Sequence, residues 1–385
     1  MMHDRYVRAC MIAALGLSMP AAYATNGDQM LGVTATQWGM AGAVAAAPQD
    51  AGAVLTNPAG LAVVEMDDAR IDMGFGFMNP PREVNGVESD SNLYMFPSGA
   101  MAFRNSDKVT VGMGMSGLSG MGVDFDDSME EVPGNQNVVT NKQFFKIAPG
   151  FAYRVNDKAS VGAALNIDYQ SLAMDIGAMN LHLPQNQVYG FGASVGFIYQ
   201  INEQFQFGFS YISEQAMDEF VWNTTNGTYR MTMDAPAQTS IGLAFRPDSS
   251  WLIEADVKHI AFSEVLDTVA LETPMGDSEI EFGWDDQTVF SIAAQKQLTP
   301  KTQVRFGYNY GESPIDEEDV NNNIGSLAIT ETHYSLGLTQ QVGKRVSTSF
   351  SYVRAMHNEI TSSVAPYNTI ELEQNIVNFQ ISYRN

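Results

Sequence analysis

Residues able to support nucleophilic catalysis are few in this sequence, and their spacing does not assemble a catalytic site. Beyond Ala24 the histidines are His182, His259, His333 and His357. His333 and Ser335 stand two positions apart, which would put both on one face of a strand. Such a pair needs a third group that orients the imidazole ring, and the sequence offers none. We therefore predict no catalytic residues, no cofactor and no enzymatic activity.

Acidic residues supply the candidates for a metal site. One cluster comprises Asp124, Asp126, Asp127, Glu130 and Glu131, and a second is the run Asp316–Asp319. Neither has the Asp-x-Asp-x-Asp-Gly spacing of a calcium-binding loop. The single cysteine, Cys10, excludes a disulfide framework and a cysteine-based zinc site. We expect solvated acidic loops and no metal site.

The composition excludes further classes of function. Of the 385 residues, 44 are acidic and 20 are basic, which gives a net charge of -24. A chain with this excess of negative charge is a poor partner for nucleic acid. Hydrophobic residues make up 45% and charged residues 17% of the chain, proportions that are typical of a folded protein.

The N-terminus has the pattern of a secretory signal peptide. Arg5 and Arg8 precede an apolar stretch from Ala9 to Met19, and Ala22-Tyr23-Ala24 forms an A-x-A cleavage site. The apolar stretch is roughly half the length that a membrane-spanning helix needs. We therefore expect residues 1–24 to be removed on export, and Cys10 with them.

The remaining chain alternates between apolar and small or polar residues. In Tyr189–Ile201 the odd positions carry Tyr, Phe, Ala, Val and Ile, while the even positions are mostly Gly, Ser and Gln. A soluble sandwich also alternates, but its outer face usually carries charges. An apolar face rich in Phe and Tyr opposite a small polar face is typical of a barrel with a lipid-facing exterior and a polar lumen.

Counting these segments gives fourteen strands, an even number as in bacterial outer-membrane barrels. Short polar turns alternate with the long polar loops 119–141, 171–187, 264–284 and 312–329, which is the asymmetry of periplasmic and extracellular connections. The predicted strands are 68–79, 92–104, 107–118, 142–154, 158–170, 188–201, 204–222, 228–246, 250–263, 285–298, 301–311, 330–343, 345–357 and 370–384.

Residues 25–66 do not fit the strand pattern. They are rich in Gly and Ala, too apolar for a solvated tail and too short to fold alone. We predict that they fill the lumen as a plug. The fold class is thus an all-β, 14-stranded antiparallel transmembrane barrel, residues 67–385, with an N-terminal plug (hatch) inside it.

Three motifs resemble one family of outer-membrane proteins. Within the plug, the small-residue run Gly39–Ala45 is followed by Gln49-Asp50-Ala51 and then by Asn57-Pro58-Ala59-Gly60-Leu61, directly before the first strand. Arg305–Tyr310 with Ser313-Pro314, and Asp256 through Phe262-Ser263, are similar to later family segments, although the family usually has Trp where Phe262 stands. The sequence resembles the FadL and TodX type of outer-membrane transporters of long-chain fatty acids and aromatic hydrocarbons.

This resemblance implies a transport mechanism. Outer loops would capture an apolar ligand, the hatch with its motif Asn57, Pro58 and Ala59 would rearrange, and the ligand would leave through a gap in the wall near the third strand. That strand contains Gly117, and Gly120 follows shortly after its predicted end. Because glycines weaken strands and mark bulges, these two are the candidate lateral opening.

A fatty-acid ligand would need an inward-facing base for its carboxylate. The alternation puts Lys146, Arg154 and Arg305, and with them Lys258, toward the lumen. Where we would look for bases in the fatty-acid carriers of this family, the sequence reads Gln170-Ser171 and Asp285-Asp286. Neutral aromatic or aliphatic hydrocarbons therefore remain an alternative ligand class.

The expected function is outer-membrane transport of hydrophobic compounds, with long-chain fatty acids first and hydrocarbons second. A passive structural or receptor barrel with a fixed plug is the alternative from another class. Expected partners are the hydrophobic ligand, outer-membrane lipid and lipopolysaccharide, and the barrel assembly machinery, with no nucleic acid. The protein is expected to be a monomer in the outer membrane of a Gram-negative bacterium.

Overall fold

A computed structural model describes residues 26–125 and 137–385 of the chain. The predicted signal peptide, residues 1–24, lies outside this described part, as do Asp126, Asp127, Glu130 and Glu131 of the first acidic cluster. No helix of the described part has both the length and the apolar character needed to cross a membrane.

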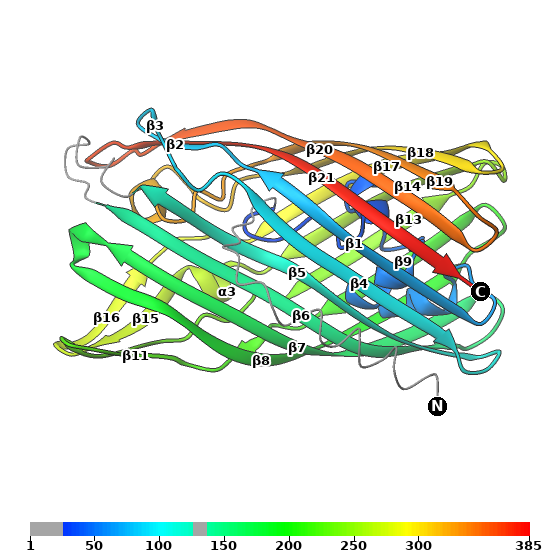
Figure 1. Ribbon diagram of the computed structural model, residues 1–385, viewed down its shortest axis with the longest axis horizontal. Helices are drawn as coiled ribbons and strands as arrows, with labels where there is room; N and C mark the ends of the chain where they lie inside the picture. The colour runs from blue at the N-terminus through cyan, green and yellow to red at the C-terminus, as the bar shows by residue number, and fades with distance from the viewer. Residues whose placement is uncertain (1–25, 126–136) are drawn as a thin grey trace.

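Fourteen antiparallel strands close into a barrel, as the sequence predicts (Figure 1). Each strand pairs with its neighbours along the chain, and pairing of β1 with β21, from Arg70 opposite Arg384 to Asn79 opposite Asn375, closes the wall. The barrel strands are β1 (Ala69–Asn79), β4 (Tyr94–Arg104), β5 (Val109–Phe125), β6 (Val138–Arg154), β7 (Ala159–Ile176), β8 (Leu181–Gln200), β9 (Phe205–Ile212), β13 (Gln238–Phe245), β14 (Trp251–Ile260), β17 (Gln287–Thr299), β18 (Thr302–Gly311), β19 (Thr332–Gln341), β20 (Val346–Thr361) and β21 (Thr369–Arg384).

The alternation of the sequence sets which side chains face lipid and which face the lumen. Phe191, Phe306 and Phe379 are exposed on the outside of the wall, whereas Gln206 and Gln380 are buried within the barrel. Successive side chains of a strand point to opposite faces. Once the apolar positions of a strand face lipid, its remaining positions must therefore face the lumen. The aromatic outer face and polar inner face agree with a wall that stands in lipid.

Two predicted strands are wrong in length. The segments 204–222 and 228–246 each divide into a long barrel strand, β9 or β13, and shorter pieces. Those pieces are β10 (Ala216–Met217), which pairs with β8, and β11 (Phe220–Thr224) and β12 (Gly227–Met231), which belong to a second sheet. The alternation continues through the pieces because the second sheet also buries one face, and alternation alone does not identify which sheet a strand joins.

The long loops form a structured outer end. β11, β12, β15 (Thr268–Thr273) and β16 (Gly276–Glu281) make a four-stranded sheet that projects beyond the wall (Figure 1). The short elements β2 (Arg82–Val84), β3 (Val87–Glu88), α3 (Ser263–Leu266), η4 (Gly177–Met179) and η5 (Val320–Asn323) complete the loops. Several predicted loop residues are strand, since β5, β6, β7 and β8 extend beyond their predicted ends.

Residues 26–66 lie inside the barrel, and we call them the hatch segment. The segment contains one short helix, α2 (Ala35–Gly39), and two 3-10 helices, η1 (Ala51–Leu55) and η2 (Pro58–Ala62). These are the blue turns enclosed by the strands in Figure 1. All residues of the three helices are buried, and Thr34, Asp50 and Asn57 cap them with side-chain oxygens that accept backbone N–H groups.

Candidate functional site

Carboxylates from the wall hold the irregular backbone of the hatch segment. Asp256 Oδ2 accepts the N–H groups of Val44 and Ala45 at 2.7 and 2.8 Å. Glu254 Oε1 accepts those of the next two residues, Ala46 and Ala47, at 2.7 and 2.9 Å. A buried backbone donor without a partner is costly, so these two strand residues replace the hydrogen bonds that a regular helix would make for itself.

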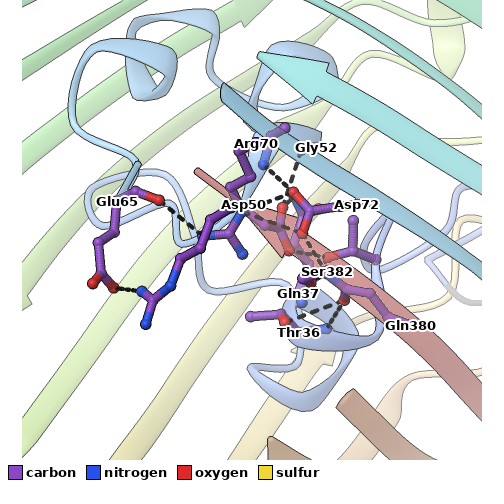
Figure 2. A network of polar contacts seen from close by, with 12 residues as sticks. Thr36, Gln37, Asp50, Gly52, Glu65, Arg70, Asp72, Gln380 and Ser382 are labelled. Carbon is purple, nitrogen blue, oxygen red and sulfur yellow. Dashed lines mark hydrogen bonds and ion pairs between the residues drawn. The ribbon is translucent and has the colours of Figure 1, made fainter. Parts of the chain in front are cut away.

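A second network attaches the hatch segment to the seam between β1 and β21 (Figure 2). Asp72 of β1 accepts the Ala51 N–H at 2.8 Å, Arg70 Nε at 2.9 Å and Gln380 Nε2 at 3.0 Å. Asp50 of the hatch segment accepts Thr34 Oγ1 at 2.5 Å and lies close to these groups. Burial raises the pKa of the Asp50 carboxyl, and the negative charge of Asp72 raises it further.

The motif Asn57, Pro58 and Ala59 packs against glycines of the wall. Asn57 Nδ2 donates to Ala45 O at 2.7 Å, and Asn57 Oδ1 accepts the Ala59 N–H at 3.2 Å, so this side chain joins two parts of the hatch segment. A Cβ added at Gly196 would lie 2.0 Å from Asn57 Oδ1, and one at Gly162 would lie 2.3 Å from Ala59 N. Only glycine at these two strand positions allows the motif to approach the wall this closely.

The four bases predicted to face the lumen are not all brought to one place. Arg154 Nη2 donates to Ala62 O of the hatch segment at 2.7 Å. Arg305 Nη1 donates to Thr339 Oγ1 at 2.7 Å, and its Nη2 donates to Gln49 Oε1 at 3.2 Å. Both arginines therefore contact the hatch segment near the short turns, away from Lys146 and Lys258.

Lys146 and Lys258 line one internal cavity of about 60 Å³, which we call the lysine cavity. Its apolar lining comes from the hatch segment and from strands on several sides of the lumen, with Met30, Leu31, Val33, Leu55, Leu118, Phe144 and Ile212. Its polar lining adds Gln29, Gln215, Gln238 and Ser240. The cavity thus combines an apolar surface with two ammonium groups, one from β6 and one from β14.

Neither lysine of this cavity has a carboxylate within ion-pair distance among the described residues. Lys146 is 4% exposed, and its Nζ lies 5.9 Å from the centre of the Phe144 ring. Asp168 stands opposite Lys146 in the β6–β7 ladder, but its carboxylate makes no hydrogen bond in the described part of the chain. Lys146 is buried and Lys258 half-buried, and Asp168 and Asp256 act on them only from beyond ion-pair distance. A buried ammonium group without an ion pair is costly, so the lysine cavity is suited to receive an anionic group.

The wall beside this cavity is interrupted at β5. The ladder between β4 and β5 ends where Ser98 stands opposite Ser116. β5 continues to Phe125 and stays paired with β6 through a bulge between Gly117 and Ser119. Gly117 and Gly120 therefore lie on the stretch of β5 that no longer pairs with β4, which we call the β5 seam.

The start of the hatch segment covers the β5 seam. Met30 N donates to Leu118 O at 3.0 Å, and Gly120 N donates to Asp28 O at 3.3 Å. Asp28 Oδ2 accepts Ser119 Oγ at 2.5 Å and Lys142 Nζ at 2.8 Å. The Asp28 and Lys142 side chains are 0% and 2% exposed, so a buried ion pair fixes residues 26–30 against the strand edge.

The comparisons with known proteins agree with this geometry. Residues 17–381 match the family described as outer membrane protein transport protein (OMPP1/FadL/TodX). The chain belongs to this family. As a member of the OMPP1/FadL/TodX family, it is a β-barrel of the Gram-negative outer membrane, from a family of transport proteins for hydrophobic compounds.

Solved structures share the fold of this family member. The toluene transporter TodX of P. putida has a TM-score of 0.78 at 17% identity, over 92% of this chain and 99% of that one. A FadL homologue of Pseudomonas aeruginosa has 0.78 at 13%, over 93% and 99%, and the toluene transporter TbuX of Ralstonia pickettii has 0.72 at 17%, over 92% and 99%. No curated protein sequence matches the chain.

Sequence reasoning missed several residues of the site in this family member. Lys142 has the same strand parity as Lys146 and could have been assigned to the lumen. Asp28 gave no signal, because its partner lies more than a hundred residues away in the chain. Glu254 precedes Asp256 by two positions, so its inward orientation also follows from alternation, but not its contact with the hatch segment.

Proposed function

We propose that this OMPP1/FadL/TodX family member transports hydrophobic compounds that carry a carboxylate, of which long-chain fatty acids are the typical class. The lysine cavity carries this proposal. A buried carboxylate without a partner costs several kcal/mol of desolvation free energy. Lys146 and Lys258 would offset this cost for a carboxylate in the cavity of about 60 Å³, and the alkyl chain would extend from it along the apolar cluster of the outer loops.

Entry is proposed to occur through the outer loops. Their interior is a continuous apolar cluster that includes Phe125, Phe220, Trp222 and Trp284, together with Met121, Met174, Met217, Met231 and Met233. Methionine side chains are flexible and adapt to apolar ligands of different shape. A ligand that enters this cluster would move along apolar side chains to Leu118 and Phe144 at the lysine cavity.

Exit is proposed to occur sideways at the β5 seam after the hatch segment rearranges. The strand edge there is covered by residues 26–30 and not by β4, so the cover can leave while the ladders of the barrel persist. Met30 and Leu118 line the lysine cavity and also form the hydrogen bond across the seam. Displacement of residues 26–30 would therefore connect the cavity directly with the strand edge.

Neutral hydrocarbons are the second candidate ligands. The positions Gln170-Ser171 and Asp285-Asp286 have no base, and two of the solved structures with this fold are named toluene transporters. An aromatic hydrocarbon would use the same apolar lining and would gain nothing from the two lysines. The two ligand classes therefore respond differently to removal of the positive charges.

The test is uptake of labelled oleate and labelled toluene by cells that make Lys146→Met, Lys258→Met or both. Oleate uptake should fall by about tenfold or more in the double variant, and toluene uptake should persist, because only oleate carries a charge. Lys158→Met is the matched control, since Lys158 is exposed in a short turn. Unchanged oleate uptake in the double variant would favour neutral hydrocarbons. Failure of the unaltered protein to take up either compound would favour a passive structural barrel.

A further inference from the structure

A second hollow opens at the short-turn end of the barrel. Its volume is about 440 Å³, and we call it the turn-side hollow. The turns that follow β13 and β17 contribute to its lining, as do Thr36, Pro48, Gln49 and Val63 of the hatch segment. Short turns lie on the periplasmic side of outer-membrane barrels, so this hollow faces the periplasm beneath the hatch segment and is separate from the lysine cavity.

The turn-side hollow is positively charged in a strongly acidic protein. Its lining contains five basic residues, Arg70, Arg246, Lys301, Arg305 and Arg384, and one acidic residue, Glu65. Arg70 is paired with Asp72, and Arg384 is paired with Glu65. Arg246, Lys301 and Arg305 form no ion pair with any described residue. Glu254 and Asp50 act on Arg246 and Arg305 from beyond ion-pair distance. Basic residues nevertheless outnumber acidic ones five to one in the lining, in a chain with 44 acidic residues against 20 basic ones, so the hollow would attract an anion.

Neutral acceptors fix the most buried of these cations. Arg305 is 5% exposed and donates to Thr339 Oγ1, Gln49 Oε1 and Gln303 Oε1. These bonds orient the guanidinium group, and no carboxylate of the described residues lies in ion-pair contact with it. Arg246 donates one bond to the neutral Gln206 Oε1, at 3.3 Å. The lining of the hollow therefore keeps an excess of positive charge, which the surrounding protein screens less than bulk water would.

The rest of the lining indicates the chemistry of the partner. It is rich in hydroxyl and amide groups, with Ser249, Ser250, Ser347, Ser349, Ser382, Thr339, Gln295, Gln297 and Gln341. Such groups hydrogen-bond to hydroxyls and to anionic oxygens alike. Apolar lining is scattered, with Val63 and Leu252 among the few aliphatic side chains. The alkyl chain of a fatty acid would find no continuous apolar surface here, which argues against a fatty acid as the occupant.

We propose that the turn-side hollow binds a small, soluble, hydroxylated anion, with a carboxylate or phosphate group, from the periplasm. Arg305, Arg246 and Lys301 would supply the positive charge, and the serines and glutamines would bind the hydroxyl groups. Gln49 belongs to the hatch segment and contacts Arg305, so the occupant would lie against both the wall and the hatch segment. This site does not depend on the proposed transport of fatty acids.

The proposal can be tested by isothermal titration calorimetry on the purified, detergent-solubilised protein. Gluconate is the ligand, and glucose is its uncharged counterpart. Gluconate should bind saturably and glucose should not, because only gluconate carries a charge. Inorganic phosphate should compete with gluconate. Absence of saturable gluconate binding, or equal binding of glucose, would overturn the proposal.

Substitution of basic residues that line the turn-side hollow tests whether gluconate binds there. Lys301→Gln should weaken gluconate binding, and Arg246→Gln with Lys301→Gln should weaken it by about tenfold or more. Lys344→Gln is the matched control, because Lys344 is exposed in another short turn and does not line the hollow. Lys301 is itself exposed in a turn, so the single variant keeps the test valid if the double variant does not fold. Equal losses in the Lys301 and Lys344 variants would assign the binding to general surface charge and refute the site.

Discussion

Replacing Asp28 by Asn removes one charge from the ion pair that holds residues 26–30 over the β5 seam. Asn keeps the size of the side chain and can still accept the hydrogen bond from Ser119 Oγ, but Lys142 then remains 2% exposed without a counter-charge. Removing one partner of a buried ion pair typically destabilises by about 3 to 5 kcal/mol. Since about 1.4 kcal/mol corresponds to a tenfold change in an equilibrium, the covered state should lose stability by a factor of about a hundred or more.

The assay is the influx of small polar solutes into proteoliposomes. Folding of the barrel is checked by comparing the mobility of heated and unheated protein in SDS gel electrophoresis. Asp28→Asn should increase influx while the barrel stays folded, because the ladders of β5 with β6 do not involve Asp28. The double variant Asp28→Asn with Lys142→Met removes both charges of this pair, so it should leak less than Asp28→Asn alone. The reasoning is refuted if Asp28→Asn is as tight as the unaltered protein, or if adding Lys142→Met leaves the leak unchanged.

Three further predictions concern the wall, the hatch segment and the exit. Phe306→Arg on the lipid face should cost about 2 to 4 kcal/mol of folding free energy, measured by urea titration in lipid vesicles, while Phe306→Leu should cost far less; equal costs would contradict the facing of β18. Gly196→Ala puts a Cβ 2.0 Å from Asn57 Oδ1, whereas at Gly99 the nearest atom is 3.7 Å away. Proteolysis of the hatch segment should therefore accelerate for Gly196→Ala and not for Gly99→Ala. Gly120→Trp should block oleate uptake without unfolding the barrel, and normal uptake would remove the β5 seam from the route.

The architecture of the wall was predictable because one local rule repeats along the whole chain. Alternation of apolar and polar positions puts Phe191, Phe306 and Phe379 on the outside and Gln206 and Gln380 on the inside, and the structure has all five there. Strand ends were not predictable to the same degree. β8 begins at Leu181 and not at 188, since a strand can continue past the membrane wherever the loops fold as sheet.

The sequence indicated which residues face the lumen, but not how they are arranged there. Parity assigned Lys146 to the lumen, but a shared strand face does not reveal height in the barrel or the partner across it. Lys146 and Lys258 meet at one cavity, whereas Arg154 and Arg305 contact the hatch segment. These outcomes depend on the path of residues 26–66, and that path is fixed by contacts with strands far along the chain.

The carboxylates that hold the hatch segment also determine the order in which the molecule can form. Asp256 and Glu254 accept N–H groups from residues 44–47, which are separated from them by more than 200 positions. The first part of the chain to leave the ribosome therefore has no stable fold until one of the later strands is in place. Docking of residues 44–47 must therefore follow the formation of β14, and until then water must satisfy the carboxylates of Asp256 and Glu254.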